Sequence, residues 1–173
     1  RLVLRETLWP IIRHPVPRGL RRRVGWLYVF GSTAMTLLML QIATGIALSM
    51  VYVPSAGQAY ESLLYLNFQV PLGWMLRAIH NWSATMMLVI VVIHMIQVFL
   101  MGAYKYPREL TWMFGVALFL LTVGMAFTGQ VLRWDANSYW GLGVGVAMIG
   151  RVPFIGPALC ELLMGGPMIG GET

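Results

Sequence analysis

Two histidines inside one long apolar stretch are the residues of this sequence best suited to chemistry. His80 and His94 stand 14 positions apart between Trp74 and Met101. In an α-helix this interval spans about 21 Å and falls about 40° short of four full turns, so both side chains lie near one face. That separation is too long for one shared metal ion. Because imidazole is a common axial ligand of haem iron, and ionisable groups inside a membrane-spanning helix are functional by default, the pair predicts two separate haem sites.

Two pairs of glycines repeat the same interval. Gly31 and Gly45 are 14 positions apart, and so are Gly115 and Gly129. A glycine leaves a flat patch on a helix, where a bulky group can approach the backbone. Glycine is also common in membrane helices, and this chain has 19. Three pairs at one interval nevertheless favour two planar cofactors over the alternative, in which the buried histidines only form hydrogen bonds.

The composition indicates which elements must position these residues. Of the 173 residues, 58% are hydrophobic and 10% are charged, whereas soluble proteins carry about 25% charged residues. Three apolar stretches are long enough to cross a bilayer, which takes about 20 residues. We therefore expect an all-α integral membrane protein, a transmembrane helical bundle whose three spanning helices cover residues 26–53, 74–101 and 110–132.

The uneven distribution of basic residues predicts an orientation. Seven of the 12 lysines and arginines precede residue 26, and Lys105 and Arg108 lie in the second loop, whereas the first loop, residues 54–73, has none. The positive-inside rule puts the N-terminus and the second loop on the cytoplasmic side. Beside a membrane span, the arginine-rich start is better explained by topology and anionic lipid than by nucleic acid, so we expect no nucleic-acid partner.

This orientation sorts the six regularly spaced residues into two levels. Neighbouring spans run in opposite directions, so the first member of one pair is level with the second member of the next. The level near the cytoplasm holds Gly31, His94 and Gly115. The level near the opposite surface holds Gly45, His80 and Gly129. Each level offers a planar macrocycle one ligand and two glycine faces.

Two interfacial regions flank the haem-binding domain, which covers residues 26–132. Residues 1–25 mix arginines with apolar residues and contain helix-breaking prolines, as expected for a segment at the membrane surface. Residues 133–173 are rich in glycine, and we expect them to form a non-cytoplasmic interfacial segment with short helices over 137–149 and 158–164.

Two more side chains have an expected role. Arg77 lies one turn before His80 and could neutralise a haem propionate, although the alternative is a charge that snorkels to the membrane surface. Cys160 is the single cysteine, so no disulfide and no cysteine-cluster metal site can form within the chain. We expect Cys160 to be an ordinary packing residue.

Several short motifs resemble those of a known family. They are Gln41-Ile42-Ala43-Thr44-Gly45, Tyr60-Glu61-Ser62, Pro107-Arg108-Glu109-Leu110-Thr111-Trp112, Trp134-Asp135 and Pro153-Phe154-Ile155-Gly156. Together with the two histidines, they make the chain from Gly25 onward similar to the N-terminal part of cytochrome b, the core subunit of bc-type quinol–cytochrome c oxidoreductases. The resemblance is to the shorter form found in photosynthetic relatives and many bacteria.

The resemblance implies a function and a set of partners. Two b haems, the outer on His80 and the inner on His94, would carry electrons from a quinol-oxidising site near the outer surface to a quinone-reducing site near the cytoplasm. Tyr139, Trp140 and Gly141 match the part of the family that walls the quinol-oxidising pocket. The implied partners are a Rieske iron–sulfur protein and a cytochrome c, in a dimeric complex of the bacterial inner membrane.

The chain also departs from the family pattern. Family members often have arginine three residues after the second histidine, where this chain has Gln97, so Lys105 and Arg108 become the candidates for the inner haem propionates. A cysteine that holds an extra haem in the photosynthetic branch is replaced by Leu37, so we expect no such haem. The second histidine for each haem is expected from a fourth helix, on this chain or another.

Two other functions remain open from the sequence. One is a dihaem membrane anchor of another respiratory enzyme, of the formate dehydrogenase or hydrogenase type, although such anchors lack the Pro107–Trp112 motif. The other is a membrane scaffold without redox chemistry. A b-type haem spectrum would exclude the scaffold.

Overall fold

The computed structural model describes residues 29–166 and 168–169, in which turns and loops connect α-helices. Its helices are α3 (Val29–Ser49), α4 (Ala59–Phe68), α5 (Gly73–Leu100), α6 (Glu109–Val131), α7 (Ala136–Ile149) and α8 (Gly156–Met164). No strand occurs among the described residues, so the expected all-α class is confirmed. The interfacial segment predicted for residues 1–25 lies outside the described residues.

Three of the helices are long and apolar enough to cross a membrane. α3, α5 and α6 have 21, 28 and 23 residues, with mean hydropathies of 1.5, 2.2 and 2.0. They correspond to the three spans expected from the sequence. α3 ends at Ser49 instead of residue 53, because the chain enters a turn before Pro54.

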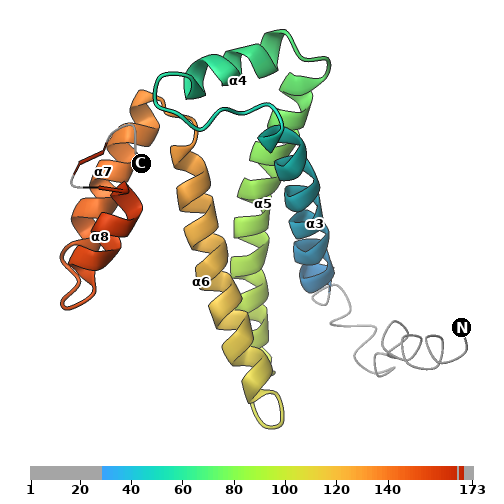
Figure 1. The fold of residues 1–173 in the computed structure, drawn as a ribbon. Coiled ribbons are helices and arrows are strands. Elements are labelled where there is room, and N and C mark those ends of the chain that lie inside the picture. The colour runs from blue at the N-terminus through green and yellow to red at the C-terminus, as the bar shows by residue number, and fades with distance from the viewer. Residues whose placement is uncertain (1–28, 167, 170–173) are drawn as a thin grey trace, which may run out of the picture.

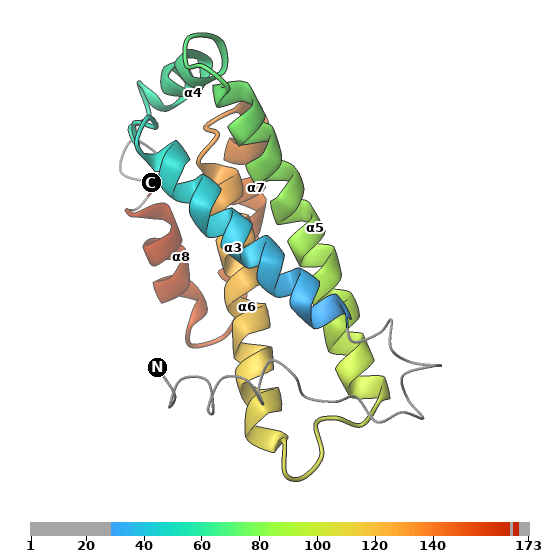
Figure 2. The same ribbon diagram turned by 90° about the vertical axis from the view of Figure 1, so that its right-hand side faces the viewer.

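The short helices lie at one end of the spans and beside α6. α4 lies across the end at which α6 joins α7, and the loop between α5 and α6 lies at the opposite end (Figures 1 and 2). The sequence alone predicts only a loop over residues 54–73. α4 is missed because its ten residues are too few to span a bilayer and give little helical periodicity. α7 and α8 occupy the two places where the sequence favours short helices.

The contact between α3 and α5 is polar, although both helices are apolar overall. The buried side chains of these two helices are polar, namely Thr44, Ser83 and Gln97, whereas the buried Gly73 packs against Leu66 of α4. Large apolar side chains face outward instead, as in Met35, which is 57% exposed. Lipid is as apolar as these side chains, so helices in a membrane associate through small residues and interhelical hydrogen bonds. This pattern supports the expected membrane setting.

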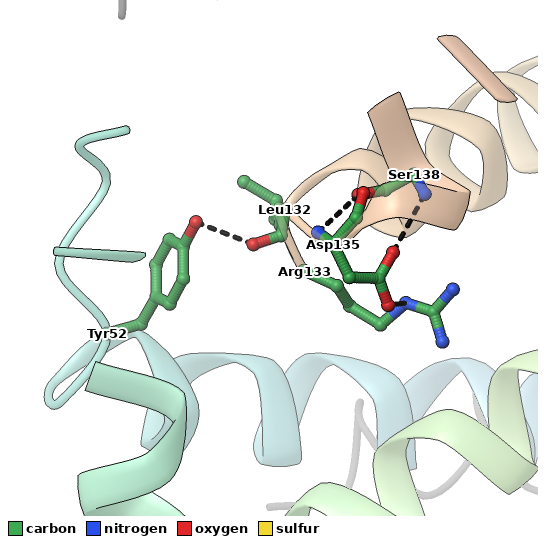
Figure 3. A network of polar contacts seen from close by, with 5 residues as sticks. All are labelled: Tyr52, Leu132, Arg133, Asp135 and Ser138. Carbon is green, nitrogen blue, oxygen red and sulfur yellow. Dashed lines mark hydrogen bonds and ion pairs between the residues drawn. The ribbon is translucent and has the colours of Figure 1, made fainter. Parts of the chain in front are cut away.

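A polar network fixes the start of α7 at the end of α6 (Figure 3). The amide of Ser138 donates to Oδ1 of Asp135 at 2.8 Å, and the Ser138 hydroxyl accepts from the Asp135 amide at 2.8 Å. This reciprocal capping box satisfies donors that a helix start would otherwise leave unpaired. Nearby, the Tyr52 hydroxyl donates to the carbonyl of Leu132 at 2.7 Å, so the segment after α3 is tied to the end of α6.

One glycine allows α7 to pack closely on α6. A Cβ at Gly145 would lie 2.5 Å from Cζ of Phe127, which is well inside van der Waals contact. A larger residue at position 145 would therefore push α7 away from α6. In this way α7 stays beside the C-terminal half of α6.

Candidate functional site

The first candidate ligand, His80, projects from α5 against α3. A Cβ at Gly45 would lie 3.4 Å from Cε1 of His80, so the imidazole ring edge rests against the bare backbone of α3. Nδ1 of the ring lies 2.8 Å from the Thr44 hydroxyl. The backbone carbonyl of His80 accepts a hydrogen bond of 2.7 Å from the Gln41 side-chain amide, which also donates to the Ser83 hydroxyl. The ring is thus held in place from one side, by α3.

The second candidate ligand, His94, has a similar setting further along α5. A Cβ at Gly31 would lie 3.2 Å from Cε1 of His94, which is tighter than most such contacts. Nδ1 of His94 lies 3.4 Å from Oε1 of Gln97, which is one turn along the same helix. Gln97 is buried, with 8% of its surface exposed. The ring of His94 is therefore oriented from its own helix.

The glycine pairs of α3 and α6 differ in their neighbours. The α3 pair meets the histidines in the order that the 14-residue interval predicts, with Gly31 at His94 and Gly45 at His80. A Cβ at Gly115 or Gly129 would meet nothing within 4 Å. The α6 pair therefore borders open space, and no residue of α6 is buried. The described residues leave a wide face of the bundle uncovered on that side.

Arg77 lies one turn before His80 and is half-buried. The one ion pair among the described residues joins Arg133 and Asp135, with 3.7 Å between Nε and Oδ2. Arg77 thus has no carboxylate partner in the part of the chain that the structure describes. Its guanidinium could therefore bind the anion of a ligand, as the propionate hypothesis requires.

The three residues expected at a quinol pocket lie in the first two turns of α7. Tyr139 and Trp140 are 43% and 70% exposed, and their rings meet edge to face with centroids 5.5 Å apart. A Cβ at Gly141 would meet nothing within 4 Å. These residues form an exposed aromatic surface on α7, while their own helix packs on α6 and α8.

Sequence reasoning missed the polar residues that hold the histidines. Thr44, Gln41 and Ser83 had no assigned role, and Gln97 counted only as a departure from the family. A usable signal was present, because a polar residue follows each histidine by three positions, at Ser83 and at Gln97. Residues three apart lie on one helical face, so a contact with the histidine was predictable in principle.

The chemistry of these residues fits haem better than a metal held by protein alone. No group of three or more histidine, cysteine, aspartate or glutamate side chains that could hold a metal ion occurs among the described residues. Each histidine gives a metal one nitrogen, and the described residues provide no cluster of further ligands. A porphyrin would provide four more. The open space beside Gly115 and Gly129 of α6 leaves room for such a macrocycle.

Comparisons with known proteins identify the family of the chain. The family model described as cytochrome b/b6/petB matches residues 16–173. Cytochrome b6 of Auxenochlorella protothecoides is 41% identical over 150 residues, which cover 87% of this chain and 70% of the relative. Cytochrome b6 of Synechococcus sp. (strain JA-3-3Ab) is 37% identical over 169 residues, which cover 98% of this chain and 79% of the relative.

A solved structure agrees with the sequence comparisons. A chain of a structure titled hyperthermophilic respiratory Complex III superposes with a TM-score of 0.76 at 31% identity. The match covers 84% of this chain but 40% of that chain, so this chain corresponds to less than half of the solved subunit. These findings favour neither a dihaem anchor of another enzyme type nor a scaffold without redox chemistry. The chain belongs to the cytochrome b/b6 family and is an electron-transferring, haem-binding subunit of a bc-type oxidoreductase complex.

Proposed function

We propose that this chain moves electrons across the membrane through two b haems, the outer held by His80 and the inner by His94. The observation that carries the proposal is that each histidine of α5 faces a glycine of α3, with its Nδ1 occupied by a hydrogen bond. Nε2 of each ring is then the nitrogen left for iron. A b haem at each position supplies an iron that accepts and releases one electron.

The residues of the chain position the two haems and separate them. The 14 residues between the histidines correspond to about 21 Å along α5, so the two residues would hold haems in different halves of the bilayer. Gly31 and Gly45 give the two imidazoles room against α3, and Gly115 and Gly129 would let a macrocycle approach the open face of α6. Arg77 would pair with a propionate of the outer haem.

The bundle needs further helices to complete each site. The described spans contain one histidine for each proposed haem, and a six-coordinate b haem takes two axial ligands. We assign the second ligand of each haem to C-terminal cytochrome b helices, on this chain or another. These helices would cover the open face of the bundle at α6. No residue of α6 is buried in the described structure.

The substrate in this proposal is a quinol, oxidised near the outer surface, with quinone reduced near the cytoplasm. Tyr139, Trp140 and Gly141 form one wall of the quinol-oxidising site, since their exposed aromatic surface suits a flat apolar ring. Oxidation of one quinol to quinone releases two protons and two electrons. One electron would enter the haems of this chain, and the other would go to a Rieske iron–sulfur protein and from it to a cytochrome c. The complex is a dimer in the bacterial inner membrane, with the N-terminus of this chain cytoplasmic.

Substitution of each histidine tests the haem assignment. We expect His80→Ala and His94→Ala each to remove one haem from the purified complex and to leave the other intact, because the two sites share no ligand. The haem content by pyridine haemochrome should fall by about half in each variant, and the reduced-minus-oxidised spectra of the two variants should differ.

The matched control is Asn81→Ala, which changes an exposed residue on the same turn of α5. This variant should retain both haems. If both histidine variants lost the same haem, the assignment of one haem to each histidine would be contradicted. Retention of both haems in either variant would remove that histidine from the proposed ligand set.

A further inference from the structure

The hydrogen bonds at His80 determine which ring nitrogen carries the proton. The Thr44 hydroxyl lies 2.6 Å from the carbonyl of Leu40, which can only accept. A hydroxyl has a single hydrogen, and this contact uses it. The hydroxyl oxygen must therefore accept from Nδ1 of His80, at 2.8 Å. Nδ1 carries the proton, and the lone pair lies on Nε2.

The same conclusion holds at His94, through a different chemical group. Oε1 of Gln97 is an amide oxygen, which only accepts, so Nδ1 of His94 donates to it over 3.4 Å. The orientation of the amide is supported by its other end, since Nε2 of Gln97 lies 3.8 Å from the sulfur of Met101. Nε2 of His94 is again the nitrogen that bears the free lone pair.

The two partners differ in how firmly they are held. Thr44 is 5% exposed, and its helix is fastened to the backbone of His80 by the amide of Gln41 at 2.7 Å. The Ser83 hydroxyl takes the second hydrogen of that amide at 2.7 Å and donates in turn to the carbonyl of Ile79. Gln97 reaches His94 within one helix and over a longer distance.

We propose that Thr44 and Gln97 are positioning residues, which hold Nδ1 of His80 and of His94 respectively and so present Nε2 to the haem iron. The inference rests on the proposed haem function and adds what controls each ligand. A hydrogen bond from the remote nitrogen fixes the ring orientation and makes the imidazole a stronger donor to the metal. A stronger donor stabilises ferric over ferrous iron. Each partner therefore lowers the reduction potential of its own haem.

The test at His80 removes the hydroxyl and keeps the shape of the side chain. In Thr44→Val, the reduction equilibrium constant of the His80 haem should rise about tenfold, which is about 59 mV for a one-electron couple. Titration in the His94→Ala background isolates that haem as a single curve. Thr44→Ser keeps the hydroxyl and should restore the original potential. Thr36→Val is the matched control, because its hydroxyl donates to the Ser32 carbonyl of its own helix and should shift neither haem.

The second test replaces Gln97, the hydrogen-bond partner of His94. Gln97→Met replaces the buried amide by an apolar side chain of similar length, and it should raise the potential of the His94 haem while the His80 haem stays unchanged. The expected shift is smaller than for Thr44→Val, because the hydrogen bond that is lost is longer. Titration of this variant in the His80→Ala background gives the single-haem curve.

The outcomes separate this inference from the haem assignment itself. Unchanged potentials in Thr44→Val and Gln97→Met, with full haem content, would overturn the inference and leave the assignment in place. Thr44→Val could also lose the His80 haem altogether. In that case, a Thr44→Ser variant that keeps this haem at the original potential supports the inference. Loss of the haem in both variants overturns it. Retention of both haems in His80→Ala or His94→Ala would instead refute the proposed function.

Discussion

At the residue scale, the site depends on two glycines of α3, which have no side chain, as much as on the imidazoles of α5. The two glycines of α3 give the rings their space, since a Cβ at Gly31 or Gly45 would lie 3.2 or 3.4 Å from a ring carbon. The polar contacts of Thr44 and Gln97 then orient the rings. Their geometry favours a ligand role for Nε2 over the alternative, in which the histidines only join neighbouring side chains.

A larger residue at Gly45 tests this steric requirement. We expect Gly45→Leu to displace His80 and to reduce the content of the outer haem by at least half, because the new side chain must occupy the position of the ring edge. The inner haem at His94 should keep its spectrum. The haem spectra and content of the purified variant provide the measurement.

Gly124→Leu is the control for that substitution. A Cβ at Gly124 would meet nothing within 4 Å, and this glycine belongs to neither spaced pair. The control should retain both haems. If Gly45→Leu removed the inner haem and spared the outer one, the assignment of Gly45 to His80 would be wrong.

At the element scale, α7 begins at a cap that its own sequence provides, directly after the end of α6. Its first turn is fixed by the capping box of Asp135 and Ser138. The hydrogen bond from the Ser138 amide is the main reason that the pKa of the Asp135 carboxyl lies below its ordinary value, and Arg133 lowers it further. The exposed aromatic pair of α7 follows directly after this cap.

Removing the cap should loosen the start of α7. Asp135→Ala should cost about 1 kcal/mol in local stability, which corresponds to about fivefold faster hydrogen exchange at the Ser138 amide. Because the folded-state pKa of Asp135 is lowered, its contribution is complete above the unfolded-state pKa and is lost as the pH falls through the folded-state pKa. The wild-type amide should therefore approach the exchange behaviour of the variant only in acid.

Asn137→Ala changes the exposed neighbour within the same turn and serves as the control for Asp135→Ala. Exchange at the Ser138 amide should stay at the wild-type rate in this control. Equal exchange rates in Asp135→Ala and wild type at neutral pH would mean that the cap does not hold α7.

At the scale of the whole molecule, the described bundle is open on one side. α6 has no buried residue, and its glycine pair borders free space. Its large apolar side chains, such as Leu121 at 65% exposure, must be covered by lipid, cofactor or other helices. This openness agrees with membership in a multi-subunit complex.

The sequence predicts the three spans and the pairing of Gly31 and Gly45 with the histidines, because both follow from length, hydropathy and a fixed helical interval. The glycine pair of α6 contacts neither histidine in the described structure. The sequence does not predict α4, whose ten residues give too short a pattern. It also misses the Thr44–His80 contact, because that bond depends on how α3 rotates and slides against α5. Such interhelical geometry is determined by packing, and no local spacing encodes it.

The most direct test of two separate haem positions is a potentiometric titration of the purified wild-type complex, followed at the reduced b-haem band. Two one-electron components of similar amplitude are expected, since His80 and His94 lie about 21 Å apart along α5 and have different hydrogen-bond partners. One component should disappear in His80→Ala and the other in His94→Ala. A single component in the wild type, or the loss of both components in either variant with the complex still assembled, would contradict two independent haems on α5.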